Sequence, residues 1–103
     1  MEIEKKATDA KIRLAPAGEV TLSNVGALQA ALRECLVGGS PVLLDLERVT
    51  GIDLAGLQVL VASAYSFAAR RQPLTILRGR CVEQAWVEAG FPCGEVSGWR
   101  RQS

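Results

Sequence analysis

The sequence predicts a single α/β domain in which a mixed sheet of about four strands packs against helices. Two short apolar runs, 42–46 and 74–77, indicate buried strands. Between them, an apolar stripe at helical spacing from Leu54 to Ala68 predicts a helix that ends near Arg71. Such a strand–helix–strand unit holds its two strands in parallel through a right-handed crossover. With 103 residues, the chain can bury one two-layer core but not two.

The N-terminal part of the chain is expected to form a lead-in followed by a hairpin. Residues 1–10 are polar and carry alternating charges, so we expect them to lead into the first strand. Apolar and polar residues then alternate on either side of Pro16-Ala17-Gly18, which predicts a hairpin or a strand–turn–strand unit. The apolar members of this pattern are Ile12, Leu14, Val20 and Leu22.

A first helix is predicted to begin after Ser23 or Asn24, either of which can cap it. Gly38-Gly39-Ser40-Pro41 ends this helix, because glycine adopts the left-handed cap conformation and proline cannot continue the helix. Its apolar face is expected to consist of Val25, Leu28, Leu32, Cys35 and Leu36.

The second half of the chain is expected to contribute two strands and two helices. Strand 42–46 is followed by a short polar loop, after which Asp53 caps the helix that ends near Arg71. Strand 74–77 precedes a short third helix, which ends at Gly90. The apolar residues that indicate this helix are Val82, Ala85, Trp86 and Ala89. We therefore place the domain at residues 11–92 and expect a C-terminal tail at 93–103 that forms a short strand or a loose end.

The charge and hydropathy of the chain exclude two classes of partner. Twelve basic and eleven acidic residues give a net charge of +1, whereas nucleic-acid binding requires a strong basic excess or a basic stripe. No run approaches the roughly 20 apolar residues that span a bilayer. We therefore expect no nucleic-acid partner and no direct membrane insertion.

The side chains that usually carry catalysis or bind metals are scarce. The sequence has no histidine, so serine- and cysteine-based hydrolysis lacks its usual base. Cys35, Cys81 and Cys93 show no metal-ligand spacing, and Asp45 and Asp53 supply too few oxygen ligands for a cation. The glycines match neither a dinucleotide-binding motif nor a P-loop. We therefore expect no enzymatic activity, no metal and no cofactor, and the free thiols favour a cytoplasmic location.

The junction between strand 42–46 and the following helix carries the most informative motif. It reads V-T-G-I-D-L-A-G-L over residues 49–57. This segment resembles the STAS domain, the module of bacterial anti-sigma factor antagonists and sulfate-transporter tails, in which the corresponding motif is close to D-S-S-G-L. Asp53, Gly56 and Leu57 match that motif, whereas its two serine positions hold Leu54 and Ala55. The resemblance extends in element order from about Lys11 to Phe91.

Ala55 is the most informative difference from the family motif, because the second serine of that motif is the family's phosphorylation site. Alanine has no oxygen to phosphorylate, and Ser63 lies eight residues further on, about 12 Å along the helix. Thr21 occupies the position at which many family members carry an aspartate. The resemblance therefore implies that phosphorylation does not control this loop, and Thr50 is the nearest upstream hydroxyl.

The resemblance also implies a non-catalytic module that binds a protein. In the family, the surface around the D-S-S-G-L loop docks on a partner, which for the anti-sigma factor antagonists is a kinase-like anti-sigma factor. An alternative is a STAS subunit of a larger assembly, such as a lipid-transport ATPase or a chemosensory complex, and a third possibility is ligand sensing in a pocket beneath the helix tip. The predicted partner-binding residues are Thr50, Gly51, Asp53, Leu54, Ala55, Gly56 and Gln58.

Two of these residues have alternative explanations that the sequence leaves open. Leu54 provides either an exposed apolar contact for a partner or part of the hydrophobic core. Gly56 costs up to about 1 kcal/mol relative to alanine in a helix, so it serves either close packing on the sheet or close approach by a partner.

Overall fold

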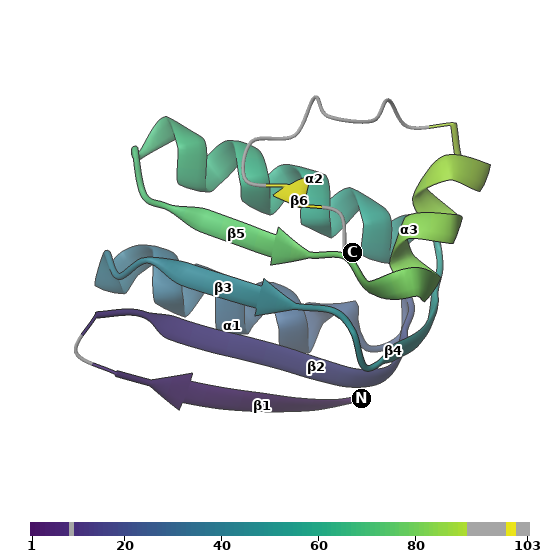
Figure 1. Ribbon diagram of the computed structural model, residues 1–103, viewed down its shortest axis with the longest axis horizontal. Coiled ribbons are helices and arrows are strands. Elements are labelled where there is room, and N and C mark those ends of the chain that lie inside the picture. The colour runs from purple at the N-terminus through teal and green to yellow at the C-terminus, as the bar shows by residue number, and fades with distance from the viewer. Residues whose placement is uncertain (9, 91–98, 101–103) are drawn as a thin grey trace.

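A computed structural model describes residues 1–8, 10–90 and 99–100 of the chain (Figure 1). The strands and helices, in chain order, are β1 (Glu2–Ala7), β2 (Ile12–Val20), α1 (Val25–Gly38), β3 (Val42–Asp45), β4 (Val49–Ile52), α2 (Leu54–Ala69), β5 (Leu74–Leu77), α3 (Gly79–Glu88) and β6 (Trp99–Arg100).

These elements form a mixed β-sheet covered by helices, which confirms the predicted α/β fold class. The strand order is β1-β2-β3-β5-β6, with β1 antiparallel to β2 and the other neighbours parallel. β4 lies off this path and pairs in parallel with the C-terminal end of β2. Figure 1 shows α1 and α2 together on one face of the sheet, while α3 packs near β4 at one end.

The core lies between this sheet and the helices. The predicted apolar face of α1 is buried except for Leu36, which is partly buried. Trp86 of α3 and Phe67 of α2 are each 1% exposed and are the largest fully buried side chains in the described part of the chain. Among the described residues, no helix is long and apolar enough to cross a membrane.

The expected lead-in at residues 1–10 was wrong, because residues 2–7 form the edge strand β1. Ile3 packs against the core, while Glu4 lies within 4 Å of three basic side chains. These are Lys6, Arg13 and Arg48. A single apolar anchor and a charged outer face therefore suffice for an edge strand, since charged side chains protect the free edge of a sheet.

The predicted hairpin around Pro16 was also wrong, because β2 continues through this residue. Residues 12–14 of β2 pair with β3 and residues 18–20 pair with β4, so Pro16 lies between the two parallel ladders. Its missing N–H therefore interrupts neither ladder. The register shifts between Gly18 and Glu19, where Gly18 has φ = 95°.

The polar loop predicted between 46 and 53 was wrong in part, since it contains the strand β4. The helix predicted to end near Arg71 ends at Ala69, and Arg71 takes φ = 55°. In the predicted C-terminal tail, residues 99–100 form a strand whose backbone pairs with β5, and the other tail residues lie outside the described part of the chain.

Candidate functional site

The candidate site is the start of α2, which the chain enters directly from β4. Asp53 lies between these elements with an extended backbone (φ −101°, ψ −177°). Its Oδ1 accepts a hydrogen bond from the backbone N–H of Gly56 at 3.0 Å. This is the N-cap predicted from the sequence, and it satisfies one of the N–H groups that a helix start leaves unpaired.

The other carboxylate oxygen of Asp53 reaches a distant part of the chain. Oδ2 accepts a hydrogen bond from the backbone N–H of Leu22 at 2.9 Å, in the loop between β2 and α1. The N–H groups of Gly56 and then Leu22 lower the pKa of Asp53 below its ordinary value, because they stabilise the ionised carboxylate. One side chain therefore joins the loops that precede α1 and α2.

Two leucines lie exposed on either side of this link. Leu54 is 55% exposed at the first position of α2, and Leu22 is 77% exposed. The structure thus answers the question that the sequence left open for Leu54, which is not a core residue. Leu22 was missed as a site residue, because its place in the alternating apolar pattern assigned it to a strand.

The other predicted residues occupy the same end of the molecule. Thr50 is exposed on β4, Gly51 follows it on that strand, and Ala55 and Gln58 lie on the first turns of α2, partly buried and exposed respectively. We define the tip surface as the exposed or partly exposed residues of 19–23 and 50–58, apart from Ile52, which packs against the core. These residues are Glu19, Thr21, Leu22, Ser23, Thr50, Gly51, Asp53, Leu54, Ala55 and Gln58.

Gly56 is buried, and its environment explains why the position holds glycine. A Cβ atom at this position would lie 2.6 Å from Cγ1 of Ile52 and 3.1 Å from Cγ1 of Val20. Both distances are too short for ordinary packing. Close packing of α2 on the sheet therefore accounts for this glycine without any contact from a partner.

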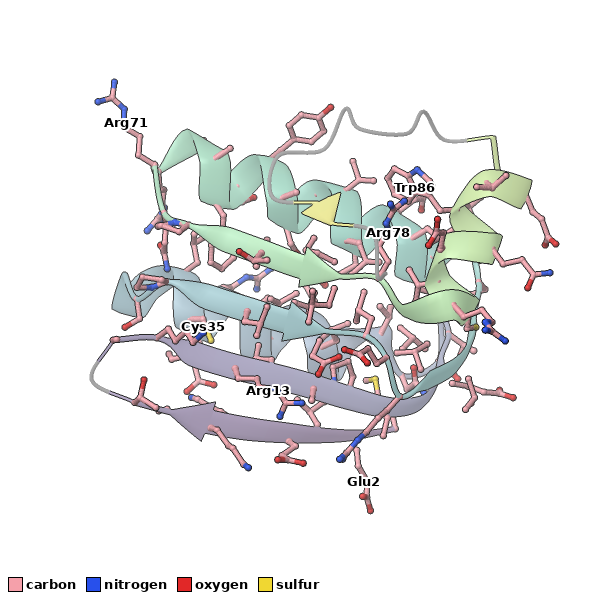
Figure 2. The ribbon with its side chains drawn as sticks, in the orientation of Figure 1. Glu2, Arg13, Cys35, Arg71, Arg78 and Trp86 are labelled. Carbon is pink, nitrogen blue, oxygen red and sulfur yellow. The ribbon has the colours of Figure 1, made fainter. Side chains whose placement is uncertain are left out.

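Asp45 and two of the cysteines, which lie outside the tip, are buried or partly buried. Asp45 is 8% exposed, and its Oδ2 lies 2.6 Å from Nη2 of Arg13, whose side chain lies on the sheet face in Figure 2. Burial raises the pKa values of the Cys35 and Cys81 thiols. In the described ranges 1–8, 10–90 and 99–100, no three His, Cys, Asp or Glu side chains are grouped so as to hold a metal ion.

A shallow cavity of about 90 Å³ lies between α1 and α2 rather than at the helix tip. Its floor is apolar and includes Leu32 and Phe67, while Arg33, Ser63 and Ser66 add polar groups. None of its lining residues belongs to the tip surface, so this cavity gives no support to the idea of a ligand pocket beneath the tip.

The sequence model described as "Mlab, STAS domain" matches residues 3–87. The chain belongs to the STAS domain family. The match begins within β1 and ends within α3, so it includes the edge strand as well as the junction between β4 and α2. No curated protein matches the chain.

Solved structures share the fold of this STAS domain at low sequence identity. A candidate anti-sigma factor antagonist from Thermotoga maritima has a TM-score of 0.79 and 17% identity, covering 98% of this chain and 86% of that one. An anti-sigma factor antagonist from Mycobacterium paratuberculosis has a TM-score of 0.74 and 21% identity, with coverages of 88% and 82%. The unphosphorylated anti-sigma factor antagonist SpoIIAA, a Bacillus protein, gives 0.70 and 13%, with coverages of 99% and 88%.

Proposed function

We propose that this STAS domain is a non-catalytic module that binds a protein partner through its tip surface without control by phosphorylation at the helix start. The observation that carries this proposal is the 55% exposure of Leu54 beside Ala55. The exposed apolar surface of a half-buried leucine does not stabilise the isolated domain. Its burial against a partner would stabilise a complex by roughly 1–2 kcal/mol.

The partner we propose first is a kinase-like anti-sigma factor, since structures sharing this fold bear the name of anti-sigma factor antagonists. A phosphoserine at position 55 would add a charge of roughly −2 to the contact and repel or desolvate the partner. Ala55 cannot acquire this charge, so the domain would stay competent to bind. Its regulation would then depend on its abundance or on a competing partner, in the cytoplasm that its free thiols favour.

The second candidate is a fixed STAS subunit of a larger assembly, such as a lipid-transport ATPase or a chemosensory complex. The observation that favours it is the same Ala55, because a permanent subunit has no need of a phosphorylation switch that releases it. The identity of the bound partner separates the two candidates.

The test is affinity capture from a cell lysate with the tagged wild-type protein and an Ala55→Glu variant. Glutamate in the first turn of α2 is compatible with the helix dipole, so the fold should be retained while charge enters the contact. We expect the Ala55→Glu variant to capture at least tenfold less of the partner than the wild-type protein does. Ala68→Glu is the matched control, because this exposed alanine lies on the same helix about 20 Å from position 55.

Mass spectrometry of the captured protein gives the result. A kinase-like anti-sigma factor that depends on Ala55 would support the first candidate, and ATPase or chemosensory subunits would support the second. Equal capture by wild type and Ala55→Glu would place the partner surface elsewhere and contradict the proposal. Circular dichroism of both variants confirms that each is folded.

A further inference from the structure

The tip surface carries charge of one sign only. Residues 19–23 and 50–58 are all described, and their charged side chains are Glu19 and Asp53. Glu19 is exposed and pairs with Gly51 across the β2–β4 ladder. Its Cγ lies only 3.4 Å from the point where a Cβ of residue 51 would be, so the glycine lets this side chain lie over β4.

The negative charge lies beside apolar surface. The carboxylate of Asp53 accepts a hydrogen bond from the backbone N–H of Leu22, and Asp53 directly precedes Leu54, so the segments that carry the two exposed leucines meet at this carboxylate. The hydrogen bond at 2.9 Å joins the loop of Leu22 to the start of α2. The two exposed leucines and the acidic residues Glu19 and Asp53 thus lie in two segments of the chain, 19–23 and 50–58, that this hydrogen bond joins.

This arrangement argues against a second copy of the chain as the occupant. Two tip surfaces placed face to face would bring two copies of Glu19 and two of Asp53 into one interface, and like charges in an interface disfavour association. An acidic border around an apolar contact instead complements an apolar side chain bordered by basic groups, which also accelerates association.

We infer that the tip surface receives a protein surface in which an apolar side chain is bordered by arginine or lysine, and that Leu22 contacts it together with Leu54. This inference rests on the proposed function for the location of the contact. It adds a second loop, the one before α1, and it sets the sign of the charge on the partner.

The charge is tested with two synthetic peptides that share their leucines and differ only in carrying arginine or glutamate between them. Each is titrated into the ¹⁵N-labelled full chain while backbone amide shifts are recorded. We expect the arginine peptide to shift amides of residues 19–23 and 50–58 and to bind at least about tenfold more tightly than the glutamate peptide. Equal binding of both peptides, shifts confined to other residues, or no shifts at all would overturn the inference.

The role of Leu22 is tested with Leu22→Ala in the same titration. Because the side chain is 77% exposed, its truncation should leave the fold intact. It should lower the affinity for the arginine peptide about fivefold to tenfold, and Leu54→Ala should do the same. Val37→Ala is the matched control, since Val37 is 75% exposed but lies in the last turn of α1, about 18 Å from its start. A Leu22→Ala effect no larger than that of the control would remove Leu22 from the contact.

The role of Glu19 is tested with Glu19→Lys, which should reduce the preference for arginine over glutamate at least threefold. Glu34→Lys is the control for this charge change, because Glu34 is exposed on the later part of α1. The outcomes remain distinct from those of the proposed function. If Ala55→Glu abolishes capture of a cellular partner while Leu22→Ala and Glu19→Lys leave that capture unchanged, the proposed function stands and this inference fails.

Discussion

The helices α1 and α2 both begin at the same end of the sheet, but their first residues are held in different ways (Figure 1). Asn24 precedes α1 and makes no side-chain hydrogen bond to that helix. Its Oδ1 accepts from the N–H of Thr21 at 2.9 Å and its Nδ2 donates to the carbonyl of Glu19 at 2.8 Å. Asp53, by contrast, caps α2 and also accepts a hydrogen bond from Leu22 in the loop before α1.

The glycines of the two first turns show the same contrast. A Cβ at Gly26 of α1 would meet nothing within 4 Å, whereas one at Gly56 of α2 would meet Ile52 at 2.6 Å. The start of α1 is thus tied to the strand before it and is open on its outer side. The start of α2 packs closely on the sheet, and Asp53 at this junction adds one hydrogen bond to the loop with Leu22.

The largest effect on stability should come from Gly56→Ala. The methyl group has to displace Ile52 and Val20, which costs roughly 1–3 kcal/mol, and the gain in helix propensity of about 1 kcal/mol offsets only part of it. We expect a net loss of up to about 2 kcal/mol in the free energy of unfolding, measured by urea denaturation. In an Ile52→Ala background the same substitution should cost less, because the side chain that it displaces is gone.

Gly26→Ala is the paired control for this prediction. Its methyl group meets open space, so the substitution should raise the free energy of unfolding by up to about 1 kcal/mol. Opposite signs for the two glycines would confirm that α1 and α2 begin in different environments. A loss of stability at both positions would contradict the contrast.

The next effect concerns the ionised state of Asp53. A carboxyl group whose pKa is lowered in the folded state stabilises the fold at pH values above its unfolded pKa. This contribution is lost as the pH falls through the folded pKa, and Asp53 is such a group. Wild type should therefore be more stable than Asp53→Asn at about pH 6, and the difference should shrink towards about pH 3. Urea denaturation of both proteins at the two pH values measures it. A difference that stays constant with pH would mean that the charge of Asp53 is not what stabilises the tip.

The sequence predicted the elements marked by a continuous apolar run or by an apolar stripe at helical spacing. The strand 74–77 was predicted with its observed bounds, and α1 and α2 were placed to within about two residues, because their stripes follow the helical period over several turns. β1 and β4 were missed, since each has few buried side chains and is defined mainly by backbone pairing with β2. Pro16 misled the prediction, because its effect depends on which neighbours a strand pairs with at that residue.

For the candidate site, the sequence could predict the cap but not its second contact. Asp53 followed by Gly56 at cap spacing is a local signal, and the bond at 3.0 Å confirms it. The bond from Leu22 joins residues 31 positions apart, and no local pattern encodes such a contact. The exposure of Leu54 was undecidable for the same reason, because it depends on where the sheet ends relative to the first turn of α2.

The smallest effect should come from replacing Asn24, whose two hydrogen bonds hold the loop between β2 and α1. Asn24→Ala removes both and should lower the free energy of unfolding by about 1 kcal/mol, independently of pH between about 6 and 3. Asn24→Asp separates the two bonds, because it keeps an acceptor for the N–H of Thr21 and loses the donor to the carbonyl of Glu19. If Asn24→Asp retains most of the stability, the bond to Thr21 dominates. If Asn24→Ala instead shows the pH dependence expected of Asp53, the two helix starts are coupled through the Leu22 loop, and the contrast between them would no longer hold.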